Sequence, residues 1–219
     1  MEDQERLLAA VSALTAYFVG DVSMLETLTR VSELARNALG ASDQVGITLV
    51  VDGRPGTYVF TDPEIPEVDR AQYETGDGPC LAAYDTGATV LVPSTRTAHE
   101  YPRFCPTAER HGILSVVSFP LATPAGRIGA MNQYASTEGA FGPAEVEIGQ
   151  RFAAQAAYLL VNAQAYWDAR TLGENLTEAM RSRARIEQAK GIIMARTGVD
   201  ADRAFALLRQ QSQAETQAA

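Results

Sequence analysis

Lysine and cysteine are nearly missing from this sequence. Lys190 is the single lysine beside seventeen arginines, and only two cysteines, Cys80 and Cys105, occur among 219 residues. Two cysteines cannot build the disulfide framework of a small secreted protein. No apolar run approaches the ~18 residues that cross a membrane, and the acidic N-terminus lacks the basic and apolar parts of a signal peptide. We therefore expect a cytoplasmic protein with no membrane contact.

Charge is spread unevenly along the chain. The net charge is −9, yet residues 181–209 hold seven basic and three acidic side chains. That segment carries +4, and the remainder carries −13. A basic segment joined to an acidic body predicts two units with different partners.

Hydrophobic periodicity predicts helices at both ends of the chain and strands between them. A long helical pattern starts at Pro143 and reaches about Thr197, and a turn and a short last helix with Asp200 as N-cap follow. This order predicts an α+β domain of about five strands, and then an all-helical tail. The expected segments before Pro143 are a helical region 4–39 broken at Gly20 and Asp21, strands within 44–61, 87–94 and 113–135, and short helices within 64–76 and 101–112.

The stretch "YETGDGPCLAAYDTGATVLVPS", residues 73–94, holds the most informative turn of the central region. Its glycines permit a tight turn that exposes backbone N–H groups where the next helix begins. Such groups can hold an anion or a polar ligand group, and a purely structural turn explains the same residues. The candidate ligand pocket is made of Gly76, Gly78, Cys80 and Tyr84.

Cys80 is also the candidate nucleophile, because a thiol at a helix start can have a lowered pKa. His99 or His111 would be its base, but no acidic partner that could orient either base stands at a recognisable spacing. A buried, small apolar role for Cys80 is the alternative. A zinc site built from these side chains and Cys105 matches no compact ligand spacing. We therefore expect no catalytic residues, no metal and no cofactor.

Two segments, "GDGPCLAAYDTGATVLVPS" and "FPLATPAGRIGAMNQYA", resemble a GAF domain of the actinobacterial regulator type in sequence and in the order of their elements. The resemblance covers about residues 22–165. It implies an antiparallel sheet of five or six strands with helices packed on one face and a pocket on the other. It also implies a sensing or dimerising role, with a small molecule as a candidate ligand of unspecified identity.

An apolar seam follows the long helix at spacings of mostly three and four, which is typical of a coiled coil. The GAF resemblance implies that this helix pairs with its symmetry mate, so we expect a homodimer. The alternative is that the seam packs only on its own sheet. The seam consists of Ile148, Phe152, Ala156, Leu159, Ala163, Tyr166, Leu172, Leu176 and Met180.

Gly191 weakens the helix "RIEQAKGIIMARTGVD", because a glycine inside a helix costs roughly 1 kcal/mol relative to alanine. A helical wheel places Ala184, Gly191 and Ala195 on one strip of small residues, and the stem of Lys190 beside the apolar face. Such a strip permits close approach by another backbone, from a nucleic acid or from a neighbouring helix.

The segment "SRARIEQAKGIIMARTGVDADRAFALLRQQSQ", residues 182–213, resembles the first two helices of an ANTAR domain. ANTAR domains are RNA-binding antiterminators that recognise paired small hairpins in nascent transcripts and prevent a terminator from forming. They have a third helix, but this sequence reads "AETQAA" at that point, so we expect a C-terminally truncated, partial domain. The matching residues are Arg183, Ile186, Gln188 to Ile192, Gly198, Ala204, Phe205, Leu207 to Arg209 and Ser212.

These resemblances predict four parts: an N-terminal helix (1–21), a GAF sensor domain (22–165), a coiled-coil-like linker (166–180) and a partial ANTAR domain (181–219). They imply a signal-responsive, dimeric transcription antitermination regulator that binds RNA hairpins. The alternative is a GAF-based dimerisation or partner-binding protein whose tail no longer binds RNA. The candidate RNA-binding residues are Arg183, Arg185, Gln188, Lys190, Gly191, Arg196 and Arg209.

Overall fold

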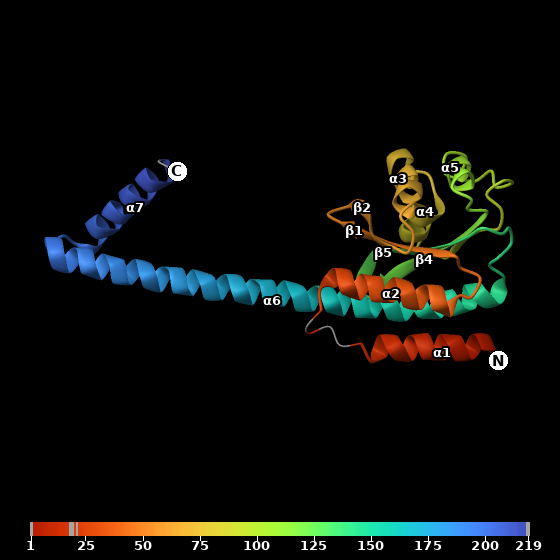
Figure 1. Ribbon diagram of the computed structural model, residues 1–219, viewed down its shortest axis with the longest axis horizontal. Helices are drawn as coiled ribbons and strands as arrows, with labels where there is room; N and C mark the ends of the chain where they lie inside the picture. The colour runs from red at the N-terminus through yellow and green to blue at the C-terminus, as the bar shows by residue number, and fades with distance from the viewer. Residues whose placement is uncertain (1, 18–19, 21, 218–219) are drawn as a thin grey trace. The chain divides into compact units, whose positions relative to one another are not determined.

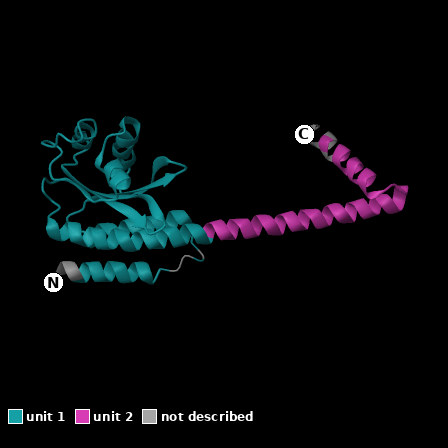
Figure 2. Cartoon of the chain, turned by 180° about the vertical axis from the view of Figure 1, so that it is seen from behind, with its two compact units in different colours: residues 1–166 teal, residues 167–219 magenta. Residues whose placement is uncertain are grey.

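The computed structural model describes residues 2–17, 20 and 22–217. The chain divides into two compact units, residues 1–166 and 167–219 (Figure 2). The predicted boundary after Asp21 and the last two residues of the predicted tail lie outside the described residues.

The first unit is built around a five-stranded antiparallel sheet (Figure 1). The strand order is β2-β1-β5-β4-β3, so the hairpins β1–β2 and β4–β5 lie side by side. The sheet confirms the predicted α+β fold, and its five strands lie within the three expected strand regions. The strands are β1 Gln44–Val51, β2 Arg54–Phe60, β3 Val90–Val92, β4 Ser115–Thr123 and β5 Gly126–Ala135.

Helices cover both faces of this sheet, including the face on which the resemblance placed a pocket. Helix α2 and the beginning of α6 pack on one face, and α3, α4 and α5 lie over the other (Figure 1). Helix α1 packs against α2. The helices of this unit are α1 Glu2–Thr15, α2 Met24–Ala38, α3 Ile65–Thr75, α4 Pro79–Thr86, α5 Cys105–Arg110 and α6 Pro143–Thr197, which continues into the second unit.

Local sequence signals account for several element ends. Ser23 caps α2 in a capping box with Glu26, in which each side chain bonds the other residue's backbone N–H. Asp52 and Gly53 both have positive φ, which is the geometry of a tight two-residue hairpin turn between β1 and β2. Gly76 ends α3 in the left-handed conformation.

The second unit consists of the C-terminal part of α6 and helix α7, Ala201–Gln217. Gly198 adopts a positive φ and its N–H reaches the Met194 carbonyl at 2.9 Å, which ends α6. Asp200 caps α7 as predicted, because its Oδ1 accepts the Arg203 N–H at 2.8 Å. Helix α7 runs on into the "AETQAA" segment, so the last helix is longer than the sequence pattern indicates.

Candidate functional site

A buried polar cluster lies between the sheet and helices α3 and α4. At its centre is Asp69 of α3, whose side chain is fully buried. Its carboxylate accepts four hydrogen bonds: from the Tyr134 hydroxyl, from the Thr57 hydroxyl at 2.8 Å, and from the amide groups of Asn132 and Gln72 at 3.3 Å each. We call the whole set the Asp69 cluster; its members are Thr48, Thr57, Asp69, Gln72, Tyr73, Cys80, Ser118, Asn132 and Tyr134.

Strand alternation brings the sheet residues of this cluster together. Successive side chains of a strand point to opposite faces, so the polar residues of β1, β4 and β5 share the face under α3. Asn132 of β5 stands opposite Ser118 of β4, which donates to it at 2.9 Å, and opposite Gly46 of β1. A Cβ at Gly46 would lie 3.0 Å from Asp69 Oδ2, so this glycine leaves room for the carboxylate.

Burial controls the ionisation of the cluster. It raises the pKa of Asp69 to about 6, although the hydrogen bonds donated by Tyr134, Thr57, Asn132 and Gln72 act in the opposite direction. Burial also raises the pKa of Tyr73 and Tyr134 above the ordinary tyrosine value. Asp69 is therefore the member of this cluster that changes charge closest to neutral pH.

The four residues of the predicted ligand pocket lie in different environments. Gly76 is exposed, and Gly78 is buried so close to Gln72 that a Cβ there would meet its side-chain oxygen at 2.2 Å. The Cys80 N–H donates to the same Gln72 oxygen at 2.9 Å. The Tyr84 ring is half-buried beneath the Arg127 guanidinium. A ligand at the N-terminus of α4 would therefore have to displace Gln72.

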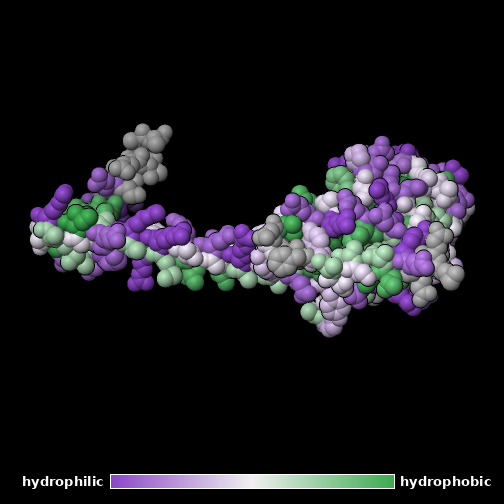
Figure 3. All heavy atoms as spheres, turned by 60° about the horizontal axis from the view of Figure 1, so that its bottom comes forward, coloured by the Kyte–Doolittle hydropathy of each residue, from purple (hydrophilic) through white to green (hydrophobic). Residues whose placement is uncertain are grey.

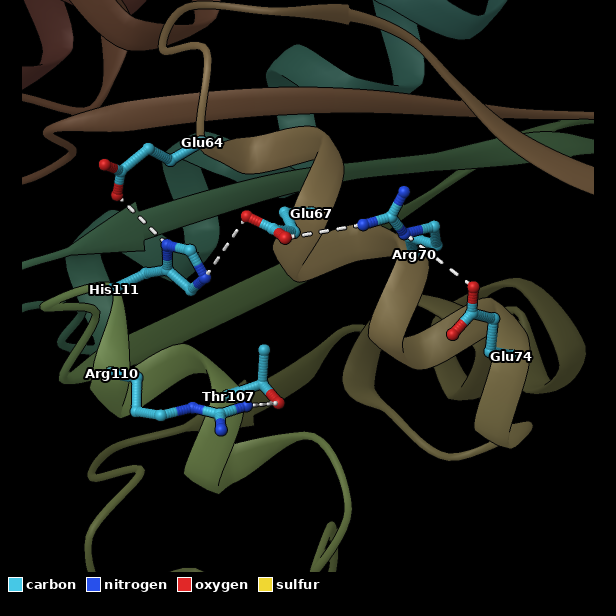
Figure 4. A network of polar contacts seen from close by, with 7 residues as sticks. All are labelled: Glu64, Glu67, Arg70, Glu74, Thr107, Arg110 and His111. Atoms are coloured by element: carbon cyan, nitrogen blue, oxygen red, sulfur yellow. Dashed lines mark hydrogen bonds and ion pairs between the residues drawn. The ribbon is translucent and has the colours of Figure 1, made fainter.

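Cys80 lacks the environment of a reactive thiol. It is fully buried, and burial together with the charge of Asp69 raises its pKa to about 12. His111, one of its candidate bases, instead contacts two carboxylates at the start of α3 (Figure 4). Its Nδ1 lies 3.0 Å from Glu64, and its Nε2 lies 3.9 Å from Glu67. Within the described part of the chain, no group of three or more His, Cys, Asp or Glu side chains could hold a metal ion.

The candidate RNA-binding residues all lie on α6 and α7 in the second unit, and all except Lys190 are exposed. The Lys190 side chain is 17% exposed, and its ammonium lies 3.0 Å from the Glu187 carboxylate. Arg185 lies 4.0 Å from Glu178. A Cβ built at Gly191 would meet nothing within 4 Å, so packing in this chain does not explain that glycine.

Apolar side chains are exposed on the second unit as well. Leu172, Leu176 and Met180 of α6 are 60–69% exposed. Figure 3 shows apolar side chains gathered along one side of this stretch of α6. These residues belong to the predicted coiled-coil seam, whereas Phe152 and Ala156, earlier in the same seam, are buried in the core of the first unit.

Sequence reasoning did not find the centre of the Asp69 cluster. A signal was present in the strands, because Thr48 and Asn132 interrupt the apolar segments "GITLVV" and "AMNQYA". Polar residues at buried strand positions need partners. No comparable signal singled out Asp69, since a carboxylate within "EVDRAQYE" is usual for a solvent-facing helix position.

Two family models match the sequence. The GAF domain model matches residues 21–161, and the ANTAR domain model matches residues 174–218. The chain therefore belongs to the GAF domain family and has an ANTAR domain C-terminal to its GAF domain, as its sequence motifs indicated. Both are regulatory domains, so this is a protein of the regulator kind.

Solved structures with the same fold come from different kinds of protein. The free methionine-R-sulfoxide reductase of Neisseria meningitidis, in complex with its substrate, is 18% identical with a TM-score of 0.58, and the match covers 74% of this chain and 90% of that one. The GAF domain of an Acinetobacter phosphoenolpyruvate-protein phosphotransferase is 14% identical with a TM-score of 0.54, covering 74% and 94%. At these identities the likeness shows the fold alone. No curated protein matches the sequence, and no helix among the described residues is long and apolar enough to cross a membrane.

Proposed function

We propose that this protein is a dimeric transcription antitermination regulator whose tail binds RNA hairpins and whose GAF domain receives the controlling signal. The observation that carries the proposal is the succession of a GAF domain and an ANTAR domain on one chain. ANTAR resemblance supplies the RNA-binding role, and GAF resemblance supplies the sensing role.

The surface of the second unit supports a contact with RNA. Arg183, Arg185, Arg196 and Arg209 are exposed, and guanidinium groups can contact phosphates and stack on unpaired loop bases. The strip of Ala184, Gly191 and Ala195 is exposed too. Because no neighbour in the chain requires a glycine at position 191, close approach by an RNA backbone offers a reason for it.

Exposed apolar residues on α6 support pairing with a second copy. Leu172 and Leu176 lie four residues apart on one side of the helix, and such a seam in water is stabilised when a symmetry mate covers it. In the first unit, a cavity of about 470 Å³ opens between Leu14 and Tyr17 near α1 and the α6 residues Tyr158 and Tyr166. Tyr158 is 47% exposed there, so the first unit by itself also offers apolar surface to a partner.

The partner-binding alternative also has a structural observation in its favour. Ile186, Ile192, Met194 and Phe205 are each at least 37% exposed in the second unit. Apolar residues gathered on a small helical unit favour a protein contact. If the tail binds a protein through this apolar surface, its exposed arginines need not contact RNA.

A gel-shift titration with tandem hexaloop RNA hairpins tests the proposal. We expect the protein to bind, and its affinity to fall steeply as salt rises, because phosphate contacts release counterions. Arg183→Ala and Arg196→Ala should each weaken binding and flatten the salt dependence. Arg151→Ala is the matched control, since Arg151 is an exposed, ion-paired arginine on α6 within the first unit.

Two results would decide against RNA binding. The first is a folded dimer that does not shift the hairpins at low salt, which would favour the partner-binding alternative. The second is equal weakening by Arg151→Ala, which would indicate an unspecific charge effect. Dimerisation is tested separately by light scattering of Leu172→Glu/Leu176→Glu, which should be monomeric, against Leu91→Glu on the edge strand β3, which should remain dimeric.

A further inference from the structure

Hydrogen bonds connect Asp69 to Cys80 through three hydroxyl groups in a single file. Thr57 donates to Asp69 Oδ2 at 2.8 Å, and the Tyr73 hydroxyl lies 2.7 Å from Thr57. Thr48 lies 2.7 Å from the same Tyr73 hydroxyl, and the Cys80 thiol lies 3.2 Å from Thr48. The file therefore joins α3 and α4 through strands β1 and β2.

An ionised Asp69 fixes the direction of every bond in this file. A hydroxyl has one hydrogen to donate and can accept as well, whereas a carboxylate only accepts. Because Thr57 gives its hydrogen to Asp69, it must accept from Tyr73, and Tyr73 must in turn accept from Thr48. Thr48 is then left as the acceptor for the Cys80 thiol.

A proton that arrives at Asp69 belongs on Oδ2. Oδ1 faces the amide N–H groups of Gln72 and Asn132, which cannot accept a hydrogen bond. It also faces the Tyr134 hydroxyl, which has no other hydrogen-bond acceptor among the described residues and would leave its own hydrogen unpaired if it accepted from Oδ1. Oδ2 faces the Thr57 hydroxyl, which can. Once Oδ2 donates to Thr57, Thr57 must donate to Tyr73, and Tyr73 must donate to Thr48. Each hydroxyl keeps one hydrogen, and the added proton comes from water.

We propose that protonation of Asp69 reverses this file of hydrogen bonds and loosens the N-terminus of α4 from the sheet, which makes the sensor domain responsive to pH. After the reversal Thr48 no longer accepts from Cys80, and its own hydrogen points to sulfur, a weak acceptor. The Cys80 N–H keeps its bond to Gln72, so α4 is loosened rather than released. This inference goes beyond the proposed function, because it holds whether or not the tail binds RNA.

The groups that face Asp69 keep their charge state over the relevant range. The phenol of Tyr134 on β5 donates a hydrogen bond to Asp69. The phenol of Tyr73 on α3 and the thiol of Cys80 on α4 interact with the charge of Asp69. The pKa of each of these three groups is raised. Strands β1, β2 and β4 contribute the uncharged hydroxyls of the cluster. Burial raises the pKa of Asp69 to about 6, which places the reversal close to neutral pH.

Nuclear magnetic resonance of the full chain can follow both ends of the file. The chemical shift of the Asp69 carboxyl carbon reports the protonation of this side chain. Hydrogen exchange of the Cys80 and Ala82 amides with solvent reports how firmly α4 is attached. On acidification from about pH 7.5 to about pH 5, amide protection should fall about fivefold, the loss expected for one neutral hydrogen bond. The midpoint should coincide with that of the Asp69 carboxyl.

Three variants complete the test. Thr57→Val removes the first link, so Asp69 should still titrate while the protection of α4 stays constant with pH. Asp69→Asn should abolish both changes. Thr95→Val is the matched control, because Thr95 is a buried hydroxyl that donates to the Ile113 carbonyl outside the file, and it should behave as the unmodified protein. Constant protection in the unmodified protein, an Asp69 that does not titrate in this range, or pH-dependent protection in Thr57→Val would each overturn the proposal.

Discussion

The two faces of the five-stranded sheet bury different kinds of side chain. Under α2 and α6, the sheet presents almost only apolar residues, among them Ile47, Phe119 and Met131. Under α3 and α4, the same strands present the Asp69 cluster, with Thr48 directly after Ile47 and Asn132 directly after Met131. Both faces are closed to solvent, so the difference between them is chemical.

This difference separates stability from responsiveness. Burial of apolar surface contributes a free energy that does not depend on pH. A buried carboxylic acid, in contrast, links the stability of the fold to proton concentration, and its hydrogen bonds change direction with its charge. The face under α3 and α4 is therefore the one through which a chemical signal can change this domain.

The largest expected effect is on the apolar face. Phe119 of β4 is fully buried and lies so close to α6 that a Cβ at Gly149 would meet its ring at 2.0 Å. Phe119→Ala should lower the free energy of unfolding by about 3–5 kcal/mol, the cost of the lost burial and the remaining cavity. Urea denaturation followed by circular dichroism should give the same loss at about pH 5 and about pH 7.5. A loss that differs between these conditions would remove the distinction between the two faces.

The alternation of apolar residues and the turn residues predict the face of the sheet under α2 and α6. They predict only part of the face under α3 and α4. Apolar residues at every second position predict a strand and its inward side without any knowledge of the partner. The burial of Asp69 depends instead on Gly46, Asn132 and Tyr134, which are distant in sequence and meet it only once β1 and β5 have paired. In the tail, the exposed arginines could be anticipated, and so could the Glu187–Lys190 pair from its spacing of three.

The next effect is the pH dependence of stability conferred by Asp69. Its pKa of about 6 in the folded protein exceeds its ordinary value of 3.8, so between these values the unfolded chain releases a proton that the folded protein keeps. The free energy of unfolding should therefore fall by about 3 kcal/mol in total as pH rises from about 4 to about 6. Above that range, Asp69 should cause no further change.

Asp69→Asn isolates this contribution, because asparagine has the same size and no charge. The difference in unfolding free energy between the unmodified protein and the variant should shift by about 3 kcal/mol in favour of the variant between about pH 4 and about pH 7.5. The measurement is urea denaturation at closely spaced pH values. A difference that stays constant over this range would mean that Asp69 ionises in the fold as it does in water.

The smallest effect concerns the partner of Asp69 on β5. Tyr134→Phe removes the hydroxyl that donates to Asp69 Oδ1 and preserves the ring, which is fully buried. At about pH 7.5 the lost bond involves a carboxylate, so the variant should be about 1.5–3 kcal/mol less stable, whereas at about pH 4 the lost bond is neutral and should cost about 1 kcal/mol. The donated hydrogen bond also lowers the pKa of Asp69, so its carboxyl resonance should titrate at a higher pH in the variant. Equal losses at both pH values, with an unchanged midpoint, would show that Tyr134 acts on this face by packing alone, as Phe119 does on the other.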